Sequence, residues 1–296
     1  MNPSWTCRAC LRSVRAQWAP FIPNFQSSSS LLPLTRFNSS QSQAQAQEQT
    51  KGSSPNRPSR PTPVQRVAKV LQNRAPAMVE TYHAFGATEH LYKECASQAI
   101  YNVPQARDKS LGEIPLSKSG KHLGVGEGWW YDELKLEPTF STWAHVTFLH
   151  MYLLTVRFRM FPPEYATTWH QHLTDHFFHD AEAKMEVLHL MTMRGMRNKF
   201  LKDLFTQWRG CLVSYDEGLV KGDAALAAAV WRNLFQGEKD VDFVALAQVV
   251  SYMRRVIAGL DQLSDGEVIE SGLKFGHVDQ EKPMVLMKSR LMDSGS

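Results

Sequence analysis

Histidines and acidic residues gather in one stretch of the 296-residue chain, at spacings that could bind a metal ion. His172, His176 and His179 share one face of a helix, because they are four and three residues apart, and Asp175 and Asp180 lie close by. Imidazoles four residues apart on a helix can converge on one zinc ion. The stretch lacks the catalytic glutamate of a metalloprotease motif, and two neighbouring phenylalanines indicate packing. We therefore interpret it as a helix whose polar histidines face solvent or a partner.

Two Glu-x-x-His units, Glu80–His83 and Glu186–His189, point to a second chemistry. Paired units of this kind form half of a di-iron carboxylate site, which would make the protein an oxidase or hydroxylase. Such a site also needs a glutamate ahead of each unit. The only glutamate before Glu80 is Glu48, in a low-complexity tract, so the required order fails. A helical mitochondrial metalloenzyme of the di-iron type is kept as the alternative function.

Other catalytic signatures are absent from the sequence. There is no GxGxxG, P-loop or GxSxG motif. Gly124, Gly126 and Gly128 alternate, but they follow no predicted strand, so phosphate binding is not expected. Cys7 and Cys10 form a CxxC pair without a second pair to complete a zinc site. The sequence predicts no catalytic residue, no metal site and no cofactor.

Aromatic residues and methionines supply the first candidate contact surface. Trp129, Trp130 and Tyr131 follow a glycine-rich loop. If exposed, they would anchor a partner, and if buried, they would lock the loop onto the helices. Met191 and Met193 are added because flexible thioether side chains adapt to varied apolar clients. These five residues are the predicted partner- or client-binding set.

A basic run supplies the second candidate surface. Arg194, Arg197, Lys199 and Lys202 lie near the start of a predicted helix. Cations at a helix N-terminus oppose the helix macrodipole, which indicates that another property keeps them there. Such a run can bind RNA phosphates or anionic lipid, or it can be a solvated face.

Helical periodicity recurs from Val64 onward, and no convincing alternating strand is present. Thr139–Met160 is apolar nearly all round, which predicts a central buried helix. Ser264 and Glu267 form a capping box for a short last helix. Residues 102–128, rich in glycine and proline, are predicted to be a long loop. The other predicted helices are 64–74, 79–101, 164–193, 198–221, 224–235 and 242–263.

Single residues are expected to separate these helices. Pro76 separates the first two, Pro162 and Pro163 end the central one, and Gly195 precedes the helix that begins at Asn198. Gly222 ends that helix, and the following Asp223 is placed to cap the next.

The N-terminal part of the chain differs in composition from the rest. Residues 1–66 hold eight Arg and Lys residues but one acid, Glu48. Arg and Ser enrichment without a continuous apolar centre is typical of a mitochondrial transit peptide. The sequence contains no stretch of about 18 uncharged apolar residues, so it predicts no membrane-spanning helix. We predict an all-α fold, a single multi-helix domain after a disordered targeting segment, divided as follows: transit peptide 1–38, disordered linker 39–63, all-helical domain 64–276 and polar tail 277–296.

Several longer stretches resemble the ubiquinol–cytochrome c chaperone family, over about residues 75–275. The stretches that carry the resemblance are Tyr82–Glu89, Trp130–Asp132, Thr139–Trp143, His176–Phe178, Asp180–Glu182, Leu201–Phe205, Gln207–Gly210, Tyr215–Asp223 and Ala229–Phe235. The resemblance implies an all-helical protein with no known catalytic role. Fungal members are mitochondrial assembly factors of the cytochrome bc1 complex, also called complex III.

The resemblance also implies partners. Fungal members form a heterodimer with a small assembly factor and sit near the tunnel exit of the mitochondrial ribosome. There they support synthesis of cytochrome b and hold the new protein before haem insertion. We therefore expect a non-enzymatic protein on the matrix side of the mitochondrion, in peripheral contact with the inner membrane. Ribosomal RNA is then the expected ligand of the basic run. A peripheral lipid-binding helical protein is a further interpretation.

Overall fold

The computed structural model describes residues 63–238, 240–270 and 273–287, and side chains from residue 80 onward. The predicted transit peptide, Cys7, Cys10, most of the predicted linker and the last part of the predicted tail lie outside the described residues. All described residues belong to the compact unit formed by residues 60–296. The boundaries proposed from the sequence stay predictions.

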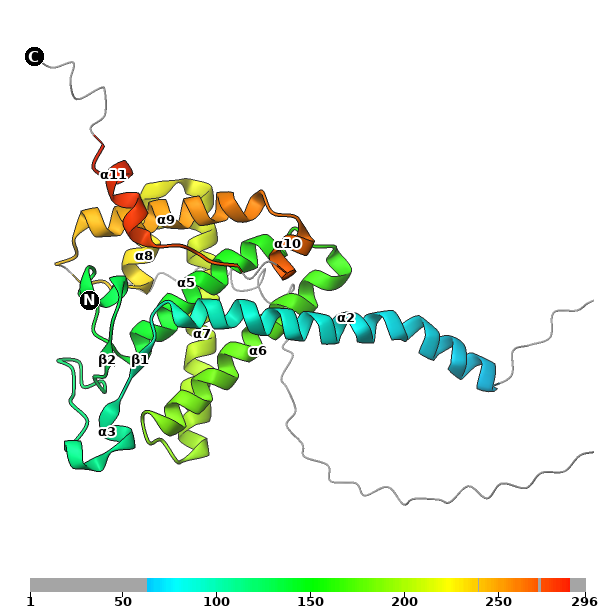
Figure 1. Ribbon diagram of the computed structural model, residues 1–296, viewed down its shortest axis with the longest axis horizontal. Coiled ribbons are helices and arrows are strands. Elements are labelled where there is room, and N and C mark those ends of the chain that lie inside the picture. Colours follow the sequence, from blue (N-terminus) through cyan, green and yellow to red (C-terminus); the bar gives the residue numbers. More distant parts are fainter. Residues whose placement is uncertain (1–62, 239, 271–272, 288–296) are drawn as a thin grey trace, which may run out of the picture. The chain divides into compact units, whose positions relative to one another are not determined.

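The described part of the chain is all-α, as predicted, with one small β-ribbon (Figure 1). The ribbon pairs β1 (Tyr101–Asn102) with β2 (Val125–Gly126) in antiparallel register and was not predicted. The helices are α2 (Pro63–Ser97), α3 (Pro104–Arg107), α4 (Trp129–Asp132), α5 (Phe140–Phe158), α6 (Pro163–Val187), α7 (Arg194–Lys221), α8 (Asp223–Asn233), α9 (Phe243–Asp261), α10 (Asp265–Glu270) and α11 (Lys282–Val285).

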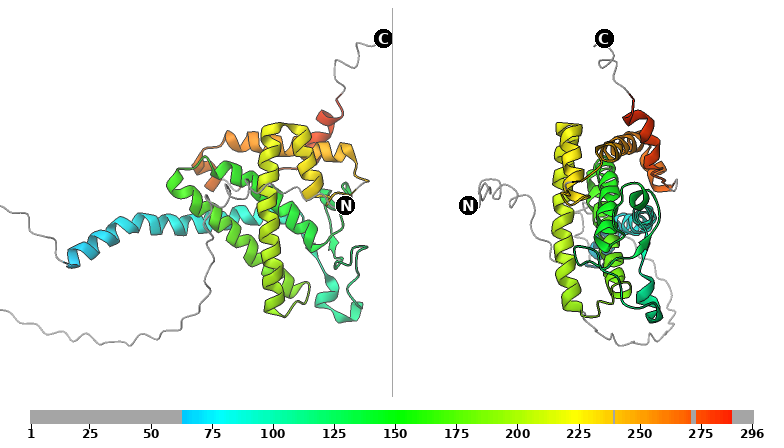
Figure 2. Two further views of the ribbon diagram at one scale, coloured as in Figure 1. Left: turned by 180° about the vertical axis from the view of Figure 1, so that it is seen from behind. Right: turned by 90° about the vertical axis from the view of Figure 1, so that its left-hand side faces the viewer.

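Helix α5 is the centre of the fold, which confirms the predicted buried helix. It begins after Thr139, whose side chain accepts a hydrogen bond from the Thr142 amide. Helices α2, α6, α7 and α9 all contact it, and they surround it in the two views of Figure 2. Phe148 of α5 packs against Phe177 of α6 and Trp208 of α7, with ring centroids 4.6 and 5.2 Å apart. This aromatic layer joins three helices into one core.

Helices α7 and α8 form a tight antiparallel pair. Gly222 ends α7 with a φ of 102°, as predicted, and it also occupies the cap position of α8, so Asp223 lies in the first turn instead of capping it. A Cβ atom on Gly218 would lie 2.6 Å from the Leu226 Cα atom. The close approach of the two helices therefore requires a glycine at position 218.

Helix α9 covers another side of α5. Asp242 caps it by accepting a hydrogen bond from the Val244 amide. Among the described residues, α9 alone is long and apolar enough to cross a membrane by length and composition, and half of that stretch is buried in the domain. Its contacts with α5 and α8 are those of a core helix.

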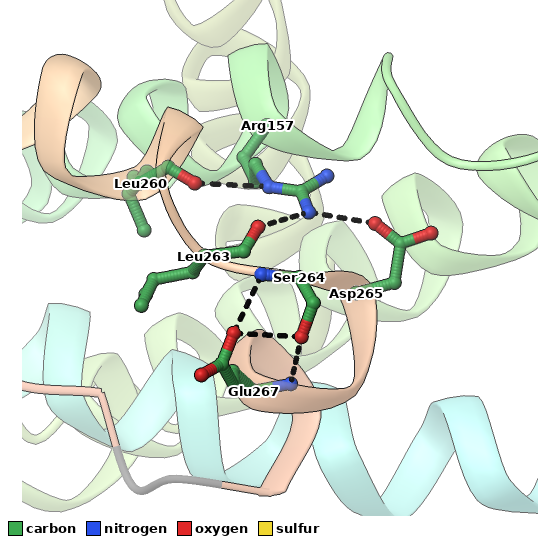
Figure 3. A network of polar contacts seen from close by, with 6 residues as sticks. All are labelled: Arg157, Leu260, Leu263, Ser264, Asp265 and Glu267. Atoms are coloured by element: carbon green, nitrogen blue, oxygen red, sulfur yellow. Dashed lines mark hydrogen bonds and ion pairs between the residues drawn. The ribbon is translucent and has the colours of Figure 1, made fainter.

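A polar clamp joins the end of α5 to the turn between α9 and α10 (Figure 3). The buried Arg157 guanidinium donates to the carbonyl oxygens of Leu260 (3.1 Å) and Leu263 (2.8 Å) and pairs with Asp265 (2.6 Å). Beside it, the Ser264 amide and hydroxyl donate to the Glu267 carboxylate, and the Glu267 amide donates back to the Ser264 hydroxyl. This is the predicted capping box, and it is confirmed.

Four predicted helix boundaries are wrong. The first long helix, α2, ends at Ser97 instead of Tyr101, which lies in β1. Helix α2 continues through Pro76, because one proline removes a hydrogen bond without necessarily ending a helix (Figure 1). Helix α6 ends at Val187 instead of Met193, because Leu190 adopts a φ of 54° and the Met191 amide donates to the Met185 carbonyl, the closure that usually involves glycine. Gly195 lies inside the first turn of α7 and separates nothing.

Candidate functional site

An open groove runs between the end of α2, the β-ribbon, α3 and α6. It consists of two adjoining hollows of about 410 and 680 Å³, which share Ile100 and Lys184 in their walls. Three apolar side chains in the larger hollow are exposed to solvent: Ile100 by 63%, Val125 by 59% and Val187 by 55%. The groove therefore presents an apolar rim.

Charged groups in the smaller hollow are already paired. The Tyr92 hydroxyl and the Lys184 ammonium each donate to the Asp180 carboxylate at 2.6 Å. The Lys184 ammonium also lies 4.7 Å from the Trp143 ring centroid. Burial, followed by the nearby Asp180 charge, raises the pKa of the Tyr92 phenol, which therefore stays protonated. An occupant of the groove does not need to supply a countercharge at this point.

Two histidines and a tyrosine hold the groove wall to the end of α6. The Tyr101 hydroxyl lies 2.6 Å from His189 Nε2, and His189 Nδ1 lies 3.2 Å from His122 Nδ1. Burial, reinforced by the neighbouring His122, lowers the pKa of His189 to about 4. His189 is therefore neutral near pH 7, and it joins β1 and the 102–128 loop to α6 by uncharged hydrogen bonds.

The alternating glycines of that loop serve packing. A Cβ atom on Gly126 would lie 2.5 Å from the Tyr131 ring, and one on Gly124 would lie 2.4 Å from the Asn102 carbonyl oxygen. Only glycine therefore allows the ribbon to lie against these neighbours. This packing accounts for Gly124 and Gly126 without phosphate binding.

The aromatic trio is mostly buried, so the locking alternative is the one observed. Trp130 and Tyr131 are 3% and 7% exposed, and Trp129 is partly buried. The Tyr131 hydroxyl donates to the Ala99 carbonyl at 2.7 Å, and the Trp130 ring lies edge-on to His150. Trp130 and Tyr131 thus fix the loop to the core, and the predicted role as partner contacts does not fit their burial.

The other predicted contact residues lie around the turn between α6 and α7. Met191 is partly buried against the core, whereas Met193 is 67% exposed. Arg194, Lys199 and Lys202 are exposed. We call residues 187–202 the α6–α7 corner. The corner borders the groove, because Val187 belongs to both.

Arg197, the fourth member of the predicted basic run, is buried and has a structural role. Its guanidinium pairs with Glu182 (3.3 Å) and Glu186 (3.5 Å) and donates to the carbonyl oxygens of Met191 and Thr192. It therefore holds the turn and is not available to a nucleic acid or a lipid.

The histidine-rich helix packs on α2. Phe85 lies against the rings of His172 and His176, and its carbonyl oxygen is 3.1 Å from His176 Nε2. Burial lowers the pKa of His176. His176 is therefore buried at this helix contact, and the interpretation that it faces solvent is wrong.

The glutamates of the two Glu-x-x-His units bind different side chains of the domain. Glu80 accepts a hydrogen bond from Trp169 Nε1 at 3.0 Å, and Glu186 pairs with Arg197. Within the part of the chain that the structure describes, no group of three or more His, Cys, Asp or Glu side chains is arranged to hold a metal ion.

Sequence reasoning missed the groove because its rim comes from separate segments. Ile100 follows α2, Val125 belongs to β2 and Val187 ends α6. Each is a single apolar residue without a local pattern, and only the fold brings the three together.

The structure thus defines a helical domain with an open apolar groove. Residues 132–275 match the model of a family described as ubiquinol-cytochrome C chaperone. The matched range begins at the end of α4 and includes α5 to α10. This segment is therefore similar to the ubiquinol–cytochrome c chaperone family, which confirms the resemblance predicted from the sequence.

Curated relatives support this similarity. The chain is 37% identical over 189 residues to Protein CBP3, mitochondrial, of Saccharomyces cerevisiae, covering 64% of this chain and 52% of that protein. It is 27% identical over 142 residues to ubiquinol-cytochrome c reductase complex assembly factor 1 of Drosophila melanogaster, covering 47% and 54% of the two chains. The chain spans about half the length of these two relatives.

One solved structure also aligns with the chain. It is the crystal structure of the Cbp3 homolog from Brucella abortus, with a TM-score of 0.49 and 18% identity, covering 72% of this chain and 98% of that chain.

Proposed function

We propose that the protein is a mitochondrial assembly factor for the ubiquinol–cytochrome c reductase complex. The observation that carries the proposal is the family match over residues 132–275, together with the 37% identity to the yeast mitochondrial protein. Several animal relatives are themselves named assembly factors of this complex. The named roles of these relatives also favour action by binding without catalysis.

The client that we propose is newly made cytochrome b, held near the tunnel exit of the mitochondrial ribosome. The protein would act on the matrix side, against the inner membrane, as a heterodimer with a small assembly factor. These proposals extend the family resemblance to this chain.

The groove is the proposed client site. Ile100, Val125 and Val187 leave apolar surface in water, and covering such surface is favourable by roughly 25 cal/mol per Å². A short apolar segment of a membrane protein can cover this rim before it reaches its own partners. Asp180 pairs with Lys184, and Glu89 pairs with Lys93. The larger hollow adds one cation, Arg107, and one acid, Glu127, so the walls of the groove carry no net charge.

Radiolabelling of proteins made inside isolated mitochondria tests the proposal. The tagged protein is recovered after the pulse, and the eluate is examined for labelled cytochrome b and for ribosomal proteins. A groove variant, Ile100→Glu with Val187→Glu, is compared with Val213→Glu and Val220→Glu on α7, where both valines are exposed and lie outside the groove walls.

We expect labelled cytochrome b with the unaltered protein and with the α7 control, and at least a tenfold loss with the groove variant. An eluate without cytochrome b in all three cases would refute the proposed function. Equal recovery with the groove variant would instead reject the groove as the client site while leaving the assembly role standing.

A further inference from the structure

The α6–α7 corner combines exposed apolar side chains with cations and contains no acid between residues 187 and 202. Besides Val187 and Met193, three of its apolar side chains are about half exposed: Leu190 by 49%, Met196 by 47% and Phe200 by 46%. The core of the domain therefore leaves about half of each of these three side chains uncovered.

The cations of the corner are free to meet an external anion. Arg194, Lys199 and Lys202 make no ion pair with any described residue. The fourth cation, Arg197, pairs inside the turn with Glu182 and Glu186 of α6. Against the two charges of these acids, the four cations of the corner leave an excess of positive charge. The surface charge of the corner is therefore positive.

The corner is a built structure at the end of two long helices. Both views of Figure 2 place the turn at the lower end of α7, where α6 arrives. The left-handed Leu190 and the Arg197 hydrogen bonds to the Met191 and Thr192 carbonyls hold the turn closed. A protruding turn of this kind can touch a flat surface without rearrangement of the helices.

This combination fits a lipid surface better than RNA. An anionic bilayer offers phosphates to cations and, a few ångströms deeper, an apolar region for side chains such as methionine, leucine and phenylalanine. An RNA backbone offers the phosphates but nothing for exposed aliphatic side chains. The apolar side chains beside the cations are therefore the observation that separates the two ligands.

We propose that the α6–α7 corner docks the protein on an anionic phospholipid bilayer. Met193, Met196 and Phe200 enter the headgroup layer, while Arg194, Lys199 and Lys202 pair with lipid phosphates. The inference rests on the proposed function for its site of action, the inner membrane, and it identifies the surface that makes the contact. Docking there would place the adjoining groove next to the bilayer.

Vesicle flotation of the full chain tests the proposal. The probes are vesicles of phosphatidylcholine alone and of phosphatidylcholine with cardiolipin. We expect binding only to vesicles that contain cardiolipin, and weaker binding as salt rises. A Gln variant of Arg194, Lys199 and Lys202 should bind on the order of 100-fold more weakly, since each cation near such a surface contributes about 1 kcal/mol.

Two matched variants keep the test specific. The apolar variant, Met196→Gln with Phe200→Gln, should also lose at least tenfold in binding, whereas Val213→Gln with Val220→Gln on the same helix should bind normally. All four side chains are exposed, so these changes leave the core intact. Circular dichroism verifies that each variant is folded.

Three results would overturn the inference. One is absence of vesicle binding by the unaltered chain, and another is unchanged binding of both corner variants. The third is RNA binding that falls with the cation variant but not with the apolar variant, in the absence of vesicle binding, which would assign the corner to ribosomal RNA. Since purified vesicles contain no cytochrome b or ribosome, failure here leaves the assembly role to its own test.

Discussion

Removal of the Arg157 guanidinium should destabilise the domain much more than removal of its exposed neighbour Arg159. In Arg157→Met, the methionine retains most of the apolar stem, but three interactions with the α9–α10 turn are lost (Figure 3). The Leu260 carbonyl retains the Leu263 amide as a donor at 3.3 Å. The loss therefore falls mainly on the Leu263 carbonyl and on the Asp265 pair.

The magnitude follows from these contacts. A hydrogen bond to a charged group contributes about 1.5–3 kcal/mol, and Asp265 recovers part of its loss from water because it is 47% exposed. We therefore expect a loss of about 3 kcal/mol in the free energy of unfolding. For a domain of this size, the melting temperature should fall by roughly 6–12 °C.

Arg159 is the matched control. It forms two hydrogen bonds with Asp216, at 2.7 and 3.0 Å, but both side chains are more than a third exposed. Arg159→Met should therefore cost less than about 1 kcal/mol. Urea unfolding and thermal melts of both variants provide the comparison. Equal costs, or a cost below about 1 kcal/mol for Arg157→Met, would refute the view that the buried clamp holds α5 to the α9–α10 turn.

Three further predictions concern packing, protonation and capping. Gly218→Ala should destabilise the protein by at least about 1 kcal/mol, because the added Cβ atom meets Leu226. Gly210→Ala has open space around it and should stabilise the protein by up to about 1 kcal/mol. The urea midpoints of the two variants check both expectations. Burial lowers the pKa of His150 to about 4, below its unfolded value of about 6.5, so the unfolded chain binds the proton first and stability falls as the pH drops from 6.5 towards 4. At pH 5 this group alone should cost about 2 kcal/mol relative to pH 7, and His150→Gln should remove that part of the pH dependence of the urea midpoint. Ser264→Ala removes the capping box and should lower the free energy of unfolding by about 1 kcal/mol. A thermal melt measures this loss, and an unchanged melting temperature would contradict the capping role.

Helix type and position were predictable where a local pattern was strong. The apolar circumference of α5 predicted its central place, and the Ser264–Glu267 spacing predicted the start of α10. Both signals lie within one segment and depend on short-range geometry. The pattern of α9 was equally clear, although the predicted range, 242–263, counted the capping Asp242 as part of the helix.

Features that depend on distant contacts were not predictable. The end of α6 depends on Leu190 in a left-handed conformation, which the sequence does not mark because glycine usually fills that position. The burial of Arg197 required knowledge that Glu182 and Glu186 lie opposite it. The four cations of the basic run are equivalent in the sequence. In the fold, one of them is buried and paired, and the other three are exposed.

The central position of α5 limits how the chain can be shortened. Helix α5 is covered by α2, which precedes it along the chain, and by α6, α7 and α9, which follow it. A fragment that ends before α9, or one that begins after α2, would leave part of this helix facing water, and such fragments are prone to aggregate. The groove and the α6–α7 corner are therefore best studied in the intact chain, because neither can be excised with its supporting core.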